Sequence, residues 1–156
     1  MDLDCILPNL YVGCCPRSMT EIEQLKQKGI TAVLNLQSDQ DLEKHRIDWC
    51  ALQAHYCDLG IELRRAPILD YNRADLSRNL KKAVAALGEL LDSGHTVFVH
   101  CNAGVNRSPT VVIAYLHWML GWDLEEADRY VQERRCCIPI LDAIRDVTSP
   151  GKHESD

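Results

Sequence analysis

Residues 96–108 read Thr96-Val97-Phe98-Val99-His100-Cys101-Asn102-Ala103-Gly104-Val105-Asn106-Arg107-Ser108, and Pro109 follows them. The apolar run at the start of this segment is typical of a strand that is buried on both faces. Pro109 fits the first turn of a helix, because its missing N–H has no partner there. The five residues between Cys101 and Arg107 let the backbone curl until its N–H groups point at one centre, and the helix adds its positive N-terminal end. Strand, loop and helix together predict a nest that binds a phosphate dianion.

The side chains at the two ends of this loop add chemistry to the phosphate site. The field that holds a phosphate also stabilises a thiolate, so we expect Cys101 to be a nucleophile at neutral pH. Arg107 can grip two phosphoryl oxygens with its planar guanidinium group. Ser108 can donate a hydrogen bond to the Cys101 sulfur, and His100 can hold the loop through backbone hydrogen bonds. The predicted phosphate-binding residues are Asn102, Ala103, Gly104, Val105, Asn106 and Arg107.

A thiolate that attacks phosphorus also needs a proton donor for the leaving oxygen. Asp70 follows the strand-like stretch 63–69, so we expect it on a loop at the same end of the sheet as Cys101. Asp75 competes for this role, but its place before the apolar helical pattern favours a helix N-cap. The remaining acids of this region are interpreted as solvated loop or helix-end charges: Asp39, Asp41 and Asp58.

Two other interpretations of the loop were weighed. Sulfur transferases of the rhodanese type also use a cysteine loop of this size, but the Arg-Ser ending and the upstream acid favour phosphoryl transfer. A chance pairing of Cys101 and Arg107 around a tight turn is disfavoured by the strand before the loop, by Gly104 within it and by the helix after it.

Strand and helix patterns alternate through the rest of the chain, which indicates an α/β domain with a largely parallel sheet. We predict one catalytic domain over residues 1–149 and a flexible C-terminal tail over 150–156. Strands are expected at 6–7, 10–12, 31–36, 62–66 and 96–100, and helices at 18–28, 48–59, 75–91, 109–120, 123–134 and 140–147.

The composition excludes several classes of protein. The chain has 156 residues, of which 46% are hydrophobic, so it can build a core, and its net charge of −6 argues against nucleic acid or an anionic membrane as a partner. No apolar run approaches the roughly 20 residues of a membrane-spanning helix. The acidic start Met1-Asp2-Leu3-Asp4 does not resemble a signal peptide. We expect no cofactor and no metal, because no cluster of cysteines and histidines has zinc spacing.

The chain contains 8 cysteines, which is a high number for this length. Cys50 and Cys57 lie seven apart on a predicted helix and are expected to be buried, and the doublets 14–15 and 136–137 should each place one thiol inward. Cys101 remains as the reactive thiol, which a neighbouring cysteine could trap as a disulfide after oxidation. A catalytic thiolate must stay reduced, so we expect a reducing, cytoplasmic compartment.

Several motifs resemble those of a known family. The His-Cys-x5-Arg-Ser loop and the upstream aspartate are the marks of the dual-specificity subgroup of cysteine-dependent phosphatases, and the resemblance covers roughly residues 6–148. It implies their α/β fold, with a central, mostly parallel sheet of about five strands flanked by helices. Within the subgroup the chain is most similar to glucan phosphatases of the laforin and plant starch-excess type. The stretches that carry this similarity are 34–48, 64–84, 100–105 and 134–144.

The resemblance also implies particular substrate contacts and shows two departures. Asn106 stands where these phosphatases usually have glycine, so we expect it to adopt the positive φ that asparagine tolerates better than most residues. Ile138 stands where the plant enzymes tend to have an aromatic residue. Glucan phosphatases stack aromatic side chains on sugar rings, and core packing is the alternative for two of the four candidates, Trp49 and Tyr56. The predicted substrate-binding residues are Tyr71, Trp49, Tyr56 and Tyr11.

These features predict an enzyme that removes phosphate from a phosphorylated α-glucan through a cysteinyl-phosphate intermediate. The alternative is a dual-specificity phosphotyrosine/phosphoserine protein phosphatase, so the expected partner is a phosphorylated glucan or a phosphoprotein. Phosphoinositide hydrolysis is disfavoured because residues 102–106 contain no lysine or arginine, and RNA 5′-triphosphate hydrolysis because the chain is acidic. A non-catalytic phosphate-binding protein is disfavoured because Cys101, Arg107 and Asp70 are all present. We expect a monomer.

Overall fold

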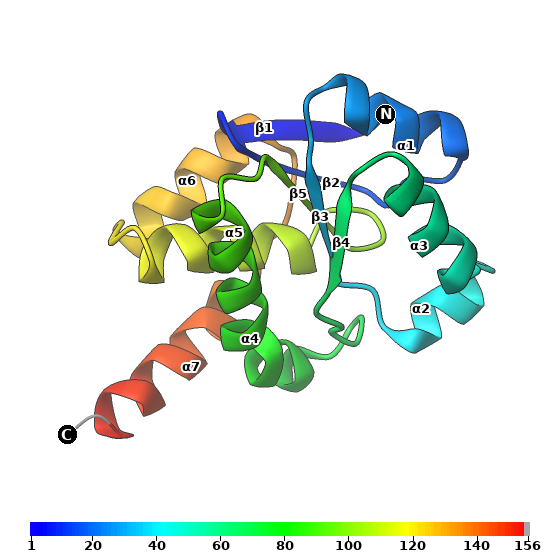
Figure 1. Ribbon diagram of the computed structural model, residues 1–156. Helices are drawn as coiled ribbons and strands as arrows, with labels where there is room; N and C mark the ends of the chain where they lie inside the picture. Colours follow the sequence, from blue (N-terminus) through cyan, green and yellow to red (C-terminus); the bar gives the residue numbers. More distant parts are fainter. Residues whose placement is uncertain (155–156) are drawn as a thin grey trace.

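The computed structural model describes the backbone of residues 1–154 and the side chains of residues 1–147 (Figure 1). It contains one five-stranded sheet in the order β1-β2-β5-β3-β4. The strands are β1 (Leu3–Leu7), β2 (Leu10–Gly13), β3 (Ala32–Asn35), β4 (Glu62–Arg65) and β5 (Val97–His100). The helices are α1 (Met19–Gln27), α2 (Asp39–Lys44), α3 (Trp49–Asp58), α4 (Arg73–Asp92), α5 (Arg107–Trp118), α6 (Leu124–Arg134) and α7 (Leu141–Glu154).

The central strand β5 lies between two parallel neighbours, β2 and β3, and β4 continues the parallel part beyond β3. Only β1 among these five strands runs antiparallel, as the partner of β2. His100, the last residue of β5, pairs with Gly13 on one side and Asn35 on the other. Because the carboxyl ends of parallel strands meet at one edge of a sheet, the loops that follow β2, β3 and β4 converge beside the loop 101–106, which follows β5. The predicted five-stranded, mostly parallel fold is confirmed.

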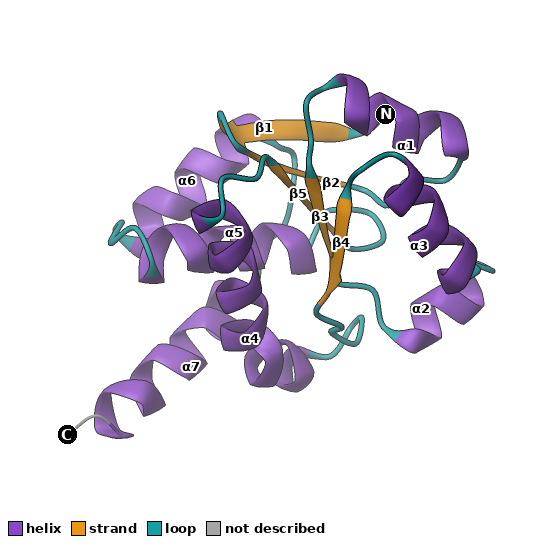
Figure 2. Ribbon diagram, viewed as in Figure 1, coloured by secondary structure: helices purple, strands orange, loops and turns teal. Residues whose placement is uncertain are grey.

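Helices cover both faces of the sheet (Figure 2). Val97 and Val99 point into the larger apolar cluster, which includes residues of α4, α5, α6 and α7. Phe98 points to the opposite face, into a smaller cluster with residues of α1 and α3. The two faces of the strand are thus both covered, which explains why β5 is buried at every position. The strand is fixed on both faces, and so is the starting point of the loop that follows it.

Some local expectations were wrong. Asp41 does not lie in a solvated loop: Ser38 and Asp41 form a capping box at the start of α2, a helix that the sequence pattern did not predict, and Asp41 is buried. The N-cap of α4 is Asn72 rather than Asp75, whose carboxylate instead accepts the Leu69 N–H at 2.8 Å. Asparagine at position 72 and aspartate at position 75 are both common N-cap residues, so the backbone geometry is needed to show which of them is the N-cap.

The cysteines also differ in part from expectation. Cys50 and Cys57 are exposed rather than buried, because they lie on the face of α3 that points away from the core. Each doublet places one thiol inward, as predicted: Cys15 and Cys137 are buried. At the other end of the chain, α7 continues to Glu154, inside the segment predicted as a tail, and residues 155–156 lie outside the described part. No helix in the described residues is long and apolar enough to cross a membrane.

Candidate functional site

The loop 101–106 connects the end of β5 to the start of α5, and its turn depends on Gly104. Gly104 has φ +69°, and a Cβ at this position would collide with the backbone of Gly13. The buried Arg135 holds the loop from below, with hydrogen bonds to the carbonyl oxygens of Gly104 at 2.7 Å and Ala103 at 3.0 Å. No residue with a side chain can replace Gly104 without moving the neighbouring strand end.

Asn106 corrects an expectation from the resemblance. Its φ is −114°, so it does not adopt the left-handed conformation that a glycine at this position would suggest. Its side-chain amide instead donates a hydrogen bond of 2.7 Å to the carbonyl oxygen of Ile138. The Ile138 N–H in turn donates to the Val105 carbonyl at 2.8 Å. Asn106 therefore ties the end of the loop to the segment before α7, which glycine could not do.

Cys101 lies at the base of a cavity of about 220 Å³. Its Sγ atom is 3.3 Å from the Oγ atom of Ser108, which is fully buried. His100 lies behind the loop, stacked on Phe98, with Nδ1 2.9 Å from the Cys101 carbonyl oxygen. Burial lowers the pKa of His100 to about 4, and because a carbonyl only accepts, Nδ1 carries the proton. His100 is thus a neutral donor to the backbone.

Arg107 is buried beside Cys101 and is held by three oxygen atoms. Its Nη1 donates to the Asp41 carboxylate at 2.6 Å and to the Ile68 carbonyl at 2.8 Å. Its Nη2 lies 3.3 Å from the Asp70 carboxylate. Its Nε finds no hydrogen-bond partner among the described residues. Asp41 and Ile68 therefore fix Nη1, while Nε and Nη2, the latter beside Asp70, form the edge that can meet phosphoryl oxygens.

Asp41 is a site residue that the sequence did not reveal. Besides Arg107, its carboxylate accepts the Ser38 N–H at 2.9 Å and the Asn102 amide at 2.9 Å. Burial raises the pKa of Asp41, but the hydrogen bonds from Arg107, Ser38 and Asn102 outweigh it and the pKa falls to about 2. Gln37 completes the network with a hydrogen bond of 2.8 Å to Asn102. The one available signal was the capping-box spacing of Ser38 and Asp41, which shows a helix start and not an arginine partner.

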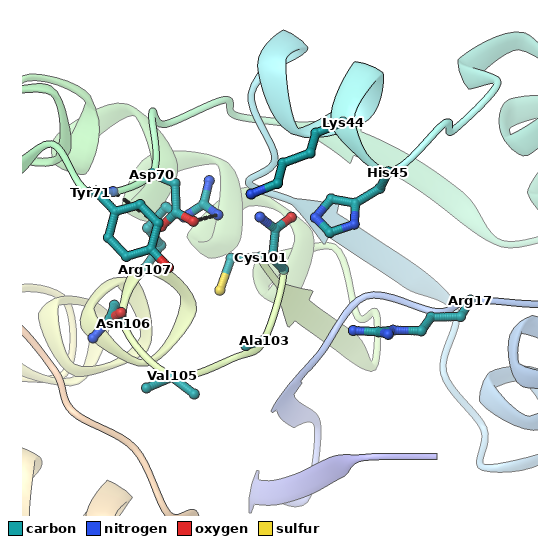
Figure 3. A pocket seen from close by; sticks show the side chains of 11 residues that line it. Arg17, Lys44, His45, Asp70, Tyr71, Cys101, Ala103, Val105, Asn106 and Arg107 are labelled. Carbon is teal, nitrogen blue, oxygen red and sulfur yellow. Dashed lines mark hydrogen bonds and ion pairs between the residues drawn. The ribbon is translucent and has the colours of Figure 1, made fainter.

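Asp70 lies on the loop between β4 and α4, at the mouth of the cavity (Figure 3). The loop brings its carboxylate to Arg107 and leaves it partly open to solvent. Asp75, the competing candidate, does not line this cavity and pairs with Arg78 at 3.2 Å. Of the two acids, the structure places Asp70 beside Cys101, where the sequence analysis expected the proton donor.

The four predicted aromatic contacts lie in very different places. Tyr71 is 94% exposed, has φ +55° and lines the cavity. Tyr56 as a substrate contact was wrong: it is 1% exposed in the core between the sheet, α1 and α3. Trp49 is half-buried with the Arg65 guanidinium 5.2 Å from its ring, and Tyr11 is half-buried against the smaller core cluster. Of these four, only Tyr71 is among the residues that line the cavity.

Three basic side chains line the other side of the cavity. Arg17 comes from the loop after β2, and Lys44 and His45 from the end of α2. Figure 3 shows them across Cys101 from Asp70 and Tyr71. The sequence did not reveal them, because Arg17 is distant in the chain from the other two and none belongs to a motif.

The sequence was compared with models of known protein families. Residues 10–143 match the family described as dual specificity phosphatase, catalytic domain. The chain belongs to this family. The match includes Cys101, Arg107, Ser108, Asp70 and Asp41.

Known members agree with this assignment, and a solved structure shares the fold. The dual specificity phosphatase chain is 35% identical over 90% of its length to phosphoglucan phosphatase DSP4 of Castanea sativa, and 32% identical over 85% to dual specificity protein phosphatase 5 of Homo sapiens. It spans only 38% and 31% of these two relatives. The crystal structure of Tk-PTP in the active form shares the fold, with a TM-score of 0.77 at 22% identity, covering 96% of this chain and 95% of that one.

Proposed function

We propose that this protein hydrolyses phosphate monoesters through a cysteinyl-phosphate intermediate. The Cys101 thiolate attacks phosphorus, the bond from phosphorus to the ester oxygen breaks, and Asp70 gives its proton to that oxygen. Water then attacks the phosphorus, Asp70 takes up a proton, and the sulfur leaves with help from the Ser108 hydroxyl. The loop N–H groups and the Nε–Nη2 edge of Arg107 hold the other phosphoryl oxygens. The 3.3 Å approach of Ser108 to Cys101 and the place of Asp70 at the cavity mouth support this scheme.

We further propose that the ester is a phosphorylated α-glucan. The observation that carries this proposal is Tyr71, whose ring is 94% exposed between two hollows. One hollow contains Cys101, and the other, of about 420 Å³, continues past Tyr71 along Leu69, Arg73 and Ile140. An exposed ring over an extended groove offers a stacking surface for sugars on either side of the phosphorylated one. The similarity to a phosphoglucan phosphatase, at 35% identity, supports the same substrate class.

Phosphate release separates this proposal from its alternative. Purified protein is incubated with solubilised phosphorylated amylopectin and, in parallel, with phosphotyrosine and phosphoserine peptides at matched phosphate concentration. Faster release from amylopectin supports the glucan proposal. Release from the peptides with none from amylopectin would contradict it and would favour a protein phosphatase, which the similarity to dual specificity protein phosphatase 5 also supports.

The role of Tyr71 is tested by removing its ring. We expect Tyr71→Ala to lower kcat/KM for phosphorylated amylopectin about tenfold, the size of one lost aromatic contact, with a much smaller change for p-nitrophenyl phosphate. Tyr71→Phe keeps the ring and the same backbone position and should retain most of the activity on amylopectin. An equal loss on both substrates would show that Tyr71 shapes the acid loop and does not bind glucan.

The role of Asp70 is tested with leaving groups of different basicity. We expect Asp70→Asn to lower kcat for glucose 6-phosphate about 100- to 1,000-fold, because its alkoxide leaves poorly without a proton. The loss for p-nitrophenyl phosphate should be smaller, since p-nitrophenolate leaves unprotonated. Asp75→Asn is the control, because asparagine still accepts the Leu69 N–H, and it should change neither rate. Equal losses for both substrates in Asp70→Asn would contradict proton donation.

A further inference from the structure

The cationic side of the cavity has no part in the proposed chemistry. Arg17, Lys44 and His45 are exposed, and they line the same cavity as Cys101. Asp70 and Arg107 act from the opposite side, and the phosphoryl oxygens are held by loop N–H groups and Arg107. In Figure 3 the side chains of Lys44 and His45 point toward the space above Cys101, and Arg17 extends toward it from farther away. Another anionic group would give these basic side chains a role there.

These charges are not neutralised by the protein. Within the described residues, none of the three forms an ion pair, although most of the arginines do. The chain has a net charge of −6, so acidic groups are available in excess. Basic side chains without an ion-pair partner contribute a positive potential on this side of the cavity, across from Asp70, and this potential is opposite in sign to the charge of the whole chain. Such a site attracts an anion of the substrate.

We infer that Arg17, Lys44 and His45 form a subsite for a second phosphate group of the same substrate molecule. This rests on the proposed function and narrows its substrate to a multiply phosphorylated sugar chain. The second phosphate belongs to the same molecule because the catalytic loop and the cations share one cavity of about 220 Å³. Phosphate fits better than a hydroxyl group because several positive charges face it, and a dianion gains from each of them.

Binding of two small sugar phosphates tests this subsite. The dissociation constants of glucose 6-phosphate and glucose 1,6-bisphosphate are measured by NMR titration in the Cys101→Ser background, which hydrolyses neither compound. We expect the bisphosphate to bind more tightly, and Arg17→Gln and Lys44→Gln each to reduce its advantage over the monophosphate about two- to fivefold, as befits exposed charge pairs. Lys82→Gln is the matched control, since Lys82 is exposed on α4 and does not line the cavity. In the Lys82→Gln variant, the ratio of the dissociation constants of the monophosphate and the bisphosphate should equal that of the Cys101→Ser protein.

The ratio is informative even if a variant is less stable, because both ligands are titrated into the same protein. An unchanged ratio in Arg17→Gln and Lys44→Gln, or an equal loss of affinity for both ligands, would overturn the subsite and show that the cations act only on the scissile phosphate. Phosphate release from amylopectin is measured separately in the same substitutions with Cys101 intact. Phosphate release from amylopectin that persists, together with an unchanged ratio of the dissociation constants, rejects the subsite alone. A changed ratio of the dissociation constants without any phosphate release from amylopectin rejects the glucan proposal alone.

Discussion

Replacing Cys101 with serine is expected to lower kcat for p-nitrophenyl phosphate by roughly 10⁵-fold, in line with the loss of a nucleophile in other covalent enzymes. The serine hydroxyl at this position has no base to ionise it, because Asp70 lies on the leaving-group side and His100 is turned to the backbone with its pKa lowered to about 4 by burial. Inorganic phosphate should still bind, since the loop N–H groups and Arg107 are unchanged. Steady-state kinetics and an NMR titration with phosphate measure the two properties.

The matched control for this substitution is Cys57→Ser. Cys57 is exposed on α3 and away from the loop, so its replacement should leave kcat within about twofold of the parent. A Cys101→Ser protein that kept a tenth of the parental rate would contradict covalent catalysis by this thiol. Loss of phosphate binding together with the rate would show that the substitution had disturbed the loop.

The sequence allowed the loop and its surroundings to be predicted because their determinants are local. The apolar run 97–99 of β5, the five-residue spacing between Cys101 and Arg107, and Pro109 in the first turn of α5 are neighbours in the chain, and each has a direct structural meaning. Asp70 could be placed at the correct end of the sheet because parallel strands bring their carboxyl ends to one edge. Periodicity alone was weaker for Cys50, Cys57 and Tyr56, since it shows that residues share a helix face but not whether that face is covered.

The residues that were missed depend on contacts between distant segments. Asp41 pairs with Arg107 across two elements, and Arg17 and Lys44 line one cavity because the segments after β2 and β3 begin at the same edge of the sheet. A carboxylate that begins a helix has the same sequence pattern whether it faces solvent or a buried arginine. The expectation that Asn106 has a positive φ was wrong for a related reason. Its φ is negative, and its hydrogen-bond partner, the Ile138 carbonyl, is distant in the chain.

Asp41→Asn should lower the free energy of unfolding more than the other substitutions proposed outside the loop. It leaves the buried Arg107 without its closest charged partner, which typically costs about 3 kcal/mol of folding free energy. Asp39→Asn is a matched control on the same helical turn. Asp39 is 91% exposed and, among the described side chains, pairs with Arg65 alone, so its loss should cost under about 1 kcal/mol. Chemical denaturation measures both differences, and equal losses would show that Asp41 does not stabilise Arg107.

The same pair predicts a pH dependence and a kinetic effect. The folded-state pKa of Asp41, about 2, lies below the ordinary value of 3.8, so its contribution to stability is complete above about pH 4 and is lost as the pH falls through 2. The difference in unfolding free energy between the parent and Asp41→Asn should therefore narrow below pH 4.

Arg107 without Asp41 loses its fixed orientation, and we expect kcat/KM for p-nitrophenyl phosphate at pH 7 to fall about 100-fold. A normal kcat/KM in a folded Asp41→Asn protein would show that Ile68 and the loop alone orient Arg107, and the buried carboxylate would then serve stability without serving catalysis.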